Sequence, residues 1–173
     1  MTQLALAKYV RDIPDFPKKG ILFKDLTPLL QNPEAFRTAE DCLFELAKEY
    51  KIDKVVGIES RGFLFGSLLA SRLGAGFVPV RKPGKLPHAT LSESYALEYG
   101  TDRLEIHRDA IRPGEQVLLH DDLLATGGTA AAACKLIQRL KGNIVQVSFL
   151  LELSSLRGRE RLTGYPVNAL ITY

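Results

Sequence analysis

Apolar segments of two different kinds alternate along most of this chain, and the alternation limits the folds that it can adopt. From about residue 33 onward, segments with apolar residues every three or four positions alternate with short, continuous apolar runs. The first pattern is typical of amphipathic helices, and the second of strands buried on both faces. The alternation therefore predicts an α/β fold, with a mostly parallel twisted sheet flanked by helices.

The expected elements can be placed by residue range. Helices are predicted at 2–11, 33–50, 63–73, 128–141 and 155–162, and strands at 54–58, 76–80, 116–119, 144–153 and 167–173. An extended hairpin is expected from 94–99 and 103–107. No repeat or linker divides the chain, so residues 1–173 are expected to form a single domain. Right-handed crossovers would place its functional loops at the carboxyl ends of the strands.

The composition excludes few functions, but it indicates where in the cell the protein is expected to act. The 173 residues can bury a core without disulfides or metals, and the net charge of +3 suits either a nucleic-acid binder or an enzyme for polyphosphates. Cys42 and Cys134 lack metal-type spacing and are expected to be reduced core thiols. Lys8 interrupts the short apolar N-terminus, and no run approaches the roughly 18 apolar residues of a membrane span. We therefore expect a cytoplasmic protein with no membrane partner.

Residues 117–129, with the sequence VLLHDDLLATGGT, carry the strongest signal for a ligand site. A helix N-terminus offers unpaired N–H groups and the positive end of its dipole, and glycines let a phosphate approach the backbone. Thr126 and Thr129 add hydroxyl donors, and Thr129 is also a candidate helix cap. Asp121 and Asp122 suit ribose hydroxyls or Mg²⁺, although only one of them would face a ligand in a regular strand. The segment thus predicts a site for a phosphorylated sugar.

Two other phosphate-binding motifs are excluded by residue type. The chain has no GxxxxGK[ST] loop, and no GxGxxG sequence opens a helix. Gly74 and Gly76 instead precede a predicted strand.

The segment 117–129 resembles the phosphoribosyl-pyrophosphate signature of the type I phosphoribosyltransferase family. The resemblance implies that Asp121 and Asp122 bind the ribose side, and that Mg²⁺ binds through the substrate pyrophosphate with these carboxylates as candidate ligands. It implies that the 5′-phosphate is held by Ala125, Thr126, Gly127, Gly128 and Thr129. His120 departs from the family, whose members usually carry an apolar residue there, and it is expected to be structural.

Residues 13–30, 57–66, 81–87 and 95–107 resemble the adenine-specific members of this family, in the family's order. The resemblance implies the type I phosphoribosyltransferase fold, with a small N-terminal hood at 1–32 and a flexible hairpin lid at 83–107. The implied reaction transfers the phosphoribosyl group of 5-phosphoribosyl-1-pyrophosphate to N9 of adenine, and it yields AMP and pyrophosphate.

Two segments are expected to bind pyrophosphate. Glu59, Ser60 and Arg61 follow a predicted strand, where an arginine and free N–H groups suit that anion. Three cations, Arg81, Lys82 and Lys85, lie in a loop with Pro and Gly. The alternatives are that Glu59 and Arg61 merely cap a helix and that the cations form a solvated surface. The resemblance favours pyrophosphate, implies a cis peptide at Glu59–Ser60, and implies a homodimer in which loop cations reach the neighbouring subunit.

The resemblance assigns the base to Leu22, Phe23 and Lys24 and the catalysis to Glu98. Phe23 would stack on adenine unless it is a core residue, and backbone groups of Leu22 and Lys24 would read the 6-amino edge of the base. Glu98 would hydrogen-bond N7 of the purine and shift its protonation, unless it is only an exposed hairpin carboxylate. Glu105 is the rival carboxylate nearby.

Two competing functions remain in view. An enzyme for hypoxanthine, guanine or xanthine would keep the fold and change the base, but residues 21–24 and the hairpin argue against it. A non-catalytic sensor would need a nucleic-acid-binding appendage or a broad basic face with interleaved aromatics. The positive charge is gathered instead in one short loop, so we expect no nucleic-acid partner.

Overall fold

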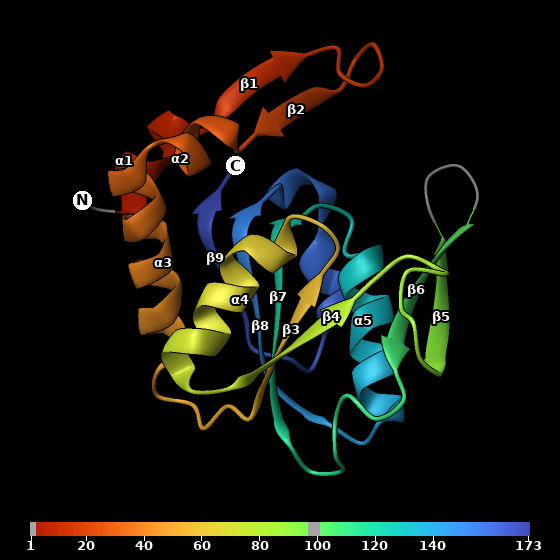
Figure 1. The fold of residues 1–173 in the computed structure, drawn as a ribbon. Coiled ribbons are helices and arrows are strands. Elements are labelled where there is room, and N and C mark those ends of the chain that lie inside the picture. The colour runs from red at the N-terminus through yellow and green to blue at the C-terminus, as the bar shows by residue number, and fades with distance from the viewer. Residues whose placement is uncertain (1–2, 97–100) are drawn as a thin grey trace. The chain divides into compact units, whose positions relative to one another are not determined.

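The computed structural model describes residues 3–96 and 101–173 (Figure 1). The chain divides into two compact units, Met1–Cys42 and Leu43–Tyr173, which are described separately. That the whole chain acts as a single domain stays a prediction.

A five-stranded parallel sheet forms the centre of the larger unit, as the sequence predicted. Its strand order is β4-β3-β7-β8-β9. These strands are β3 (Lys54–Ile58), β4 (Gly76–Val80), β7 (Gln116–Leu124), β8 (Asn143–Glu152) and β9 (Val167–Thr172). The strands are rich in buried Val, Leu and Ile because helices or loops cover both faces of the sheet.

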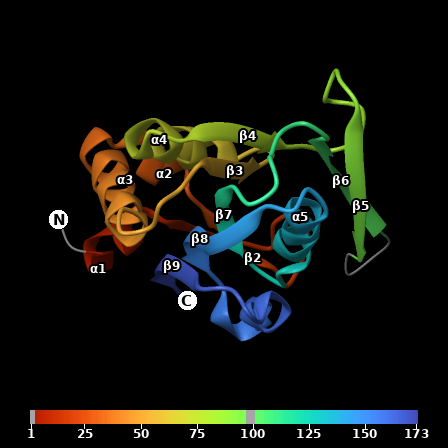
Figure 2. The same ribbon diagram turned by 90° about the horizontal axis from the view of Figure 1, so that it is seen from below.

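Two crossover helices cover the sheet. Helix α4 (Gly62–Leu73) joins β3 to β4, and α5 (Gly128–Arg139) joins β7 to β8. Since β4 and β8 lie on opposite sides of the β3–β7 pair, right-handed crossovers place the two helices on opposite faces, as Figures 1 and 2 show. The loops after β3 and β7 therefore meet at the edge where the winding reverses, which is where ligands bind in such sheets.

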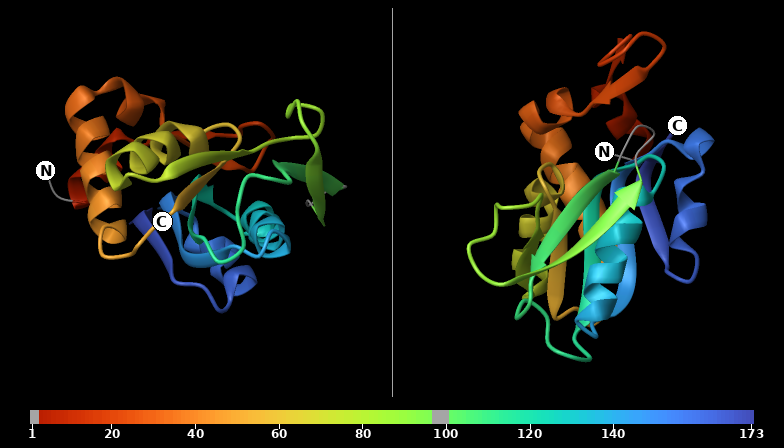
Figure 3. Two further views of the ribbon diagram at one scale, coloured as in Figure 1. Left: turned by 60° about the horizontal axis from the view of Figure 1, so that its bottom comes forward. Right: turned by 90° about the vertical axis from the view of Figure 1, so that its right-hand side faces the viewer.

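A hairpin between β4 and β7 packs along α5 (Figure 3). Its strands are β5 (Thr90–Ala96) and β6 (Thr101–His107), paired antiparallel. Leu104 and Ile106 on β6 are almost fully buried, and Glu93 on β5 forms ion pairs with Lys135 and Arg139 on α5. The described part of the predicted lid is thus anchored to the core of the larger unit.

The smaller unit corrects one sequence prediction. It contains α1 (Gln3–Leu6), a 3₁₀ turn η1 (Ala7–Tyr9), β1 (Arg11–Pro14), β2 (Leu22–Asp25) and α2 (Thr27–Gln31). Helix α3 (Pro33–Ala47) begins in this unit and ends in the larger one. The helix predicted at 2–11 was too long, because residues from Arg11 onward pair with β2 in a hairpin. Strands of four residues are too short to show a clear alternation of apolar and polar positions.

The structure also differs from the prediction in β7 and in the segment after β8. Strand β7 continues past Leu119 to Leu124, because β8 supplies hydrogen-bond partners as far as the pair Leu124–Glu152. The helix predicted at 155–162 is instead two 3₁₀ turns, η2 (Ser154–Leu156) and η3 (Gly158–Leu162). Arg157 between them has a left-handed backbone with φ of 54°, which interrupts a helix.

The cysteines and the lengths of the helices can be compared with the sequence expectations. Cys134 is buried and Cys42 half-buried, and neither forms a disulfide within the described part of the chain. Across residues 3–96 and 101–173, none of the helices combines the length and apolar composition that crossing a membrane requires.

A buried ion pair fixes the end of β8. Glu152 is nearly inaccessible to solvent, and Arg159 Nε lies 2.7 and 2.9 Å from its two carboxylate oxygens. Arg159 Nη2 donates to the same carboxylate at 2.7 Å, and Nη1 donates to the carbonyl of Val167 at 2.7 Å. A single guanidinium therefore ties η3 to both β8 and β9.

Replacing Arg159 with alanine should lower the free energy of unfolding by about 2 kcal/mol, because the buried carboxylate of Glu152 would lose its charged partner. Urea unfolding at neutral pH measures the change. Arg157→Ala is the control, since the Arg157–Glu160 pair is exposed and should contribute less than about 1 kcal/mol. Equal losses in the two variants would contradict the stabilising role of the buried pair.

Candidate functional site

The loop between β7 and α5 forms a small pocket at the helix N-terminus. Gly127 takes the N-cap position with φ of 79°, which favours glycine, and no side chain caps the helix. Thr129 is thus not the helix cap, and its hydroxyl is not needed by the first turn. The pocket has a volume of about 70 Å³, far below the roughly 300–1,000 Å³ of sites that enclose a drug-sized ligand, so it suits a small anion.

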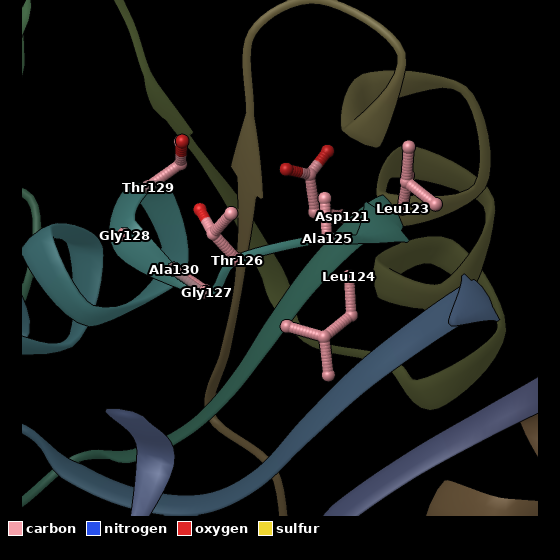
Figure 4. A pocket seen from close by; sticks show the side chains of 9 residues that line it. All are labelled: Asp121, Leu123, Leu124, Ala125, Thr126, Gly127, Gly128, Thr129 and Ala130. Carbon is pink, nitrogen blue, oxygen red and sulfur yellow. The ribbon is translucent and has the colours of Figure 1, made fainter. Parts of the chain in front are cut away.

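Figure 4 shows how side chains face this pocket. Its lining comprises Asp121, Leu123, Leu124, Ala125, Thr126, Gly127, Gly128, Thr129 and Ala130. The carboxylate of Asp121 and the hydroxyls of Thr126 and Thr129 lie on the same side of the loop. The structure thus gathers all five residues predicted to hold the 5′-phosphate, together with one of the two aspartates.

A residue that the sequence analysis missed supports this loop from behind. Gly158 on η3 packs so closely that a β-carbon there would overlap the carbonyl oxygen of Ala125 and lie 2.9 Å from Leu124 Cδ1. A β-carbon on Gly127 would in turn overlap the carbonyl oxygen of Gly158. Two glycines far apart in sequence therefore meet beneath the pocket, and no local pattern around residue 158 could have indicated the contact.

The two adjacent aspartates have different surroundings because β7 stays regular through both. Asp121 lines the pocket, whereas Asp122 is nearly inaccessible and lies 2.8 Å from Nε of Arg61. Asp121 Oδ1 also accepts a hydrogen bond from the backbone N–H of Asp122 at 2.9 Å. The alternation expected of a strand thus sends one carboxylate to the pocket and the other to an arginine at the end of β3.

Burial raises the pKa of both carboxyls. For Asp121 the nearby charge of Asp122 raises the pKa further, while for Asp122 the guanidinium of Arg61 opposes the effect of burial. The protein surroundings therefore stabilise the negative charge of the ionised pair only in part. Within the described residues no group of three or more potential metal ligands occurs, so a metal here would need further ligands from a bound molecule.

Glu59 binds the predicted cationic loop, which carries Arg81, Lys82 and Lys85. Its carboxylate accepts hydrogen bonds from Lys85 Nζ at 2.8 Å, from the backbone N–H of Lys82 at 3.0 Å, and from Arg81 Nη2 at 3.2 Å. Burial alone would raise the pKa of Glu59, but these hydrogen bonds outweigh it and lower the pKa to about 2. The carboxylate is thus ionised at neutral pH and holds the loop against the end of β3.

The loop after β3 has the expected backbone. The Glu59–Ser60 peptide is cis, as the resemblance implied, and Ser60 is exposed. Arg61 occupies the N-cap position of α4, but no side chain caps that helix, so the capping alternative for Glu59 and Arg61 was wrong.

All three loop cations have carboxylate partners in this structure. Arg81 and Lys85 pair with Glu59, and Lys82 Nζ lies 3.0 Å from Oδ2 of Asp102 on β6. The sequence analysis did not single out Asp102, whose position opposite Lys82 depends on how the hairpin folds back.

The predicted base-binding residues lie together on β2 in the smaller unit. Leu22 is about half-exposed, and the ring of Phe23 packs edge-on against Phe16 with 5.1 Å between ring centroids. Lys24 Nζ lies 2.6 Å from Asp12 Oδ1 across the hairpin. Phe23 is half-buried and is not among the fully buried core residues.

Three other predicted residues complete the account. Glu98 lies outside the described residues. Its rival Glu105 accepts a hydrogen bond from the backbone N–H of Gly84 at 3.1 Å and so helps to shape the cationic loop. His120 is fully buried, with Nδ1 2.9 Å from the hydroxyl of Ser148. Burial lowers the pKa of His120 to about 3, so the ring is neutral and structural, as expected.

Comparison with known proteins shows the family to which the chain belongs. Residues 25–166 match the model of the phosphoribosyl transferase domain. The adenine phosphoribosyltransferase of Christiangramia forsetii is 62% identical over 98% of this chain and 99% of its own length.

Solved structures give the same result. The adenine phosphoribosyltransferase of Thermoanaerobacter pseudethanolicus superimposes with a TM-score of 0.97 at 52% identity, covering 99% of this chain and 100% of that one. The Saccharomyces cerevisiae enzyme, solved with an imino-altritol bisphosphate and adenine, has a TM-score of 0.91 at 45% identity and covers 97% of both chains.

Asp121→Asn should raise the free energy of unfolding at pH 7 by about 1 kcal/mol, because it removes a carboxyl whose ionised form is disfavoured by burial and by the charge of Asp122. The melting temperature should rise by roughly 2–4 °C. A carboxyl whose pKa is raised in the folded state costs no stability below its unfolded-state pKa, and the cost grows as the pH rises from there to the folded-state pKa. The gain should therefore shrink as the pH falls toward the unfolded-state pKa. Thermal unfolding across pH measures this, with the exposed Asp109→Asn as control. A lower melting temperature for Asp121→Asn at pH 7 would contradict it.

Gly158→Ala should weaken binding of ribose 5-phosphate roughly tenfold, because the added methyl group displaces the phosphate loop at a cost of about 1–3 kcal/mol. Calorimetric titration measures the affinity. Gly114→Ala is the matched control, since Gly114 has φ of 84° but no atom near its missing side chain. It should destabilise the fold and leave the affinity of the folded protein unchanged. Equal affinities of both variants would rule out the supporting role of Gly158.

Proposed function

The chain belongs to the adenine phosphoribosyltransferases, within the phosphoribosyl transferase family, and from that premise we propose how its residues carry out the reaction. The protein is a pentosyltransferase that moves the phosphoribosyl group of 5-phosphoribosyl-1-pyrophosphate to N9 of adenine, giving AMP and pyrophosphate. The observation that carries the proposal is the convergence of the phosphate pocket, the aspartate pair and the cationic loop at the carboxyl edge of one sheet.

The phosphoribosyl end of the substrate fits the loop before α5. The 5′-phosphate would accept hydrogen bonds from the first N–H groups of the helix and from Thr126 and Thr129. Asp121 faces the same pocket and would accept hydrogen bonds from the ribose hydroxyls. This arrangement fixes the sugar from two sides, so that its anomeric carbon is held in position for attack.

The leaving pyrophosphate must be neutralised as the bond to the anomeric carbon breaks and the ring gains oxocarbenium character. Arg61 and Lys82 are the cations that we assign to this task. Arg61 pairs with Asp122, and Lys82 lies on the loop that Glu59 holds in place. Arg81 and Lys85, bound to Glu59, add positive potential at the same edge.

Magnesium fits this set of residues. The partly uncompensated charge of Asp121 and Asp122 is what a divalent cation would balance, and Mg²⁺ is commonly bound by one or two carboxylates together with substrate phosphates. When bound, the ion would neutralise charge on the leaving pyrophosphate.

Adenine recognition is proposed at Leu22, Phe23 and Lys24, where backbone groups would read the 6-amino edge and Phe23 would stack on the base. The Saccharomyces cerevisiae relative was solved with adenine, which supports adenine as the base that this chain binds. Glu98 is proposed as the group that hydrogen-bonds N7 and assists the loss of the N9 proton.

We also propose a homodimer in the cytoplasm, with no nucleic-acid or membrane partner. Its support is the family resemblance of the loop at residues 81–85, since such loops can reach the site of a neighbouring subunit.

The sharpest test is AMP formation from 5-phosphoribosyl-1-pyrophosphate, Mg²⁺ and each of adenine, hypoxanthine, guanine and xanthine. We expect turnover with adenine alone. Glu98→Gln should lower kcat by roughly 10²–10⁴-fold, the usual contribution of a positioned acid or base, while substrate binding is kept. Glu105→Gln, on the same hairpin, is the matched control and should retain kcat within about tenfold. Preference for a 6-oxo purine would overturn the base assignment, and an active Glu98→Gln would overturn the catalytic one.

A further inference from the structure

The side chain of Lys82 is bound by a carboxylate from another part of the chain. Its Nζ lies 3.0 Å from Oδ2 of Asp102, which lies near the start of β6. The lysine side chain is about half-exposed, whereas that of Asp102 is 24% exposed. The ammonium is therefore close to solvent, and an incoming anion could reach it without unfolding the hairpin.

Asp102 is itself held in place by two further hydrogen bonds. The phenol of Tyr95, directly opposite on β5, donates to Oδ2 at 3.2 Å, and Oδ1 accepts from the backbone N–H of Arg103 at 2.8 Å. The hydroxyl of Thr129, in the phosphate pocket, also interacts with the phenol and opposes the rise that burial causes in the pKa of Tyr95. A chain of polar contacts thus runs from the 5′-phosphate loop through Tyr95 and Asp102 to the cation proposed for pyrophosphate.

A carboxylate and a phosphate compete for the same donors. Both present anionic oxygens to an ammonium group at about 2.7–3.0 Å, and Lys82 cannot satisfy both with the same N–H groups. The negative charge of Asp102 also lowers the local positive potential for any anion that approaches. Binding of pyrophosphate by Lys82 therefore requires that the contact with Asp102 be broken or shared.

We propose that Asp102 is an internal competitor of pyrophosphate, which holds Lys82 when the site is empty and takes it back when pyrophosphate leaves. The inference rests on the proposed function, because it concerns the pyrophosphate-binding role of Lys82. Asp102 acts through Lys82 and touches no reacting atom, so it is a positioning residue rather than a catalytic one.

This competition has a direct use in turnover. A cation without a partner would bind the diphosphate group equally well before and after the reaction, and would slow the release of the product. The carboxylate offsets part of that affinity, and its effect should appear on pyrophosphate more than on adenine. Tyr95 keeps the carboxylate at a fixed place, so that Lys82 finds the same partner after each cycle.

Calorimetric titration of the full chain with inorganic pyrophosphate in the presence of magnesium chloride tests the inference. In Asp102→Asn the dissociation constant should fall about two- to fivefold, the range expected when one partially exposed ion pair no longer competes. Asp102→Ala is a second variant with the same expected direction, in case asparagine keeps a hydrogen bond to the lysine. Thermal unfolding verifies that each variant is folded.

Two controls separate this role from a general change of charge. Glu93→Gln removes one negative charge from the same hairpin, where the carboxylate pairs with Lys135 and Arg139 and not with Lys82, and it should leave the dissociation constant unchanged. Lys82→Ala should weaken binding, and adding Asp102→Asn to it should give no recovery, because the gain acts through the lysine.

The outcomes are distinct. An unchanged or larger dissociation constant in both Asp102 variants would overturn the inference, and so would an equal gain in Glu93→Gln or a gain that persists without Lys82. If wild-type protein binds no pyrophosphate while ribose 5-phosphate still binds, the proposed role of the cationic loop fails, and the inference fails with it. If pyrophosphate binds to the wild-type protein and the Asp102 variants bind it with the same dissociation constant, the inference fails but the proposed function is unaffected.

Discussion

The site depends on the parallel pairing of β3 with β7 at the centre of the sheet. That pairing, from Lys54–Val117 to Gly57–His120, sets side by side the two strands whose following loops carry Arg61 and the phosphate pocket. Gly62 makes the approach close, since a β-carbon there would lie 2.9 Å from Asp121 Oδ1. The first turn of α4 therefore lies directly against the aspartate pair, and the contact between Arg61 and Asp122 follows from backbone geometry.

The positive charge of the loop that carries Arg81, Lys82 and Lys85 is balanced by carboxylates of the protein. The cationic loop could be read from the sequence as an open trap for anions, but each of its side chains has a carboxylate partner in the folded chain. Such pairing lowers the repulsion among neighbouring cations and keeps their positions defined without a ligand. The carboxylates thus hold the cations in position before a ligand binds, and the oxygens of a bound substrate would replace the carboxylate oxygens.

The sequence predicted those parts of the fold and site that are local in the chain. The central strands and the loop at 125–129 follow from apolar runs and from glycine and threonine beside a helix start, all within a few residues. The end of β7 could not be predicted, because its last residues are held by β8. Gly158 and Asp102 were missed for the same reason, since each acts on a segment that only folding brings near.

The contact between Gly158 and the phosphate loop also bears on the order in which the protein becomes competent during synthesis. The pocket sequence is complete once residue 130 has left the ribosome. The backbone beneath it is contributed by η3, about thirty residues later, and η3 is anchored to β9, which follows it in the sequence. A nascent chain that ends before these segments would have the binding sequence without its support. Affinity for the sugar phosphate should therefore arise only after η3 and β9 have been synthesised, so the ligand can stabilise only chains that contain both segments.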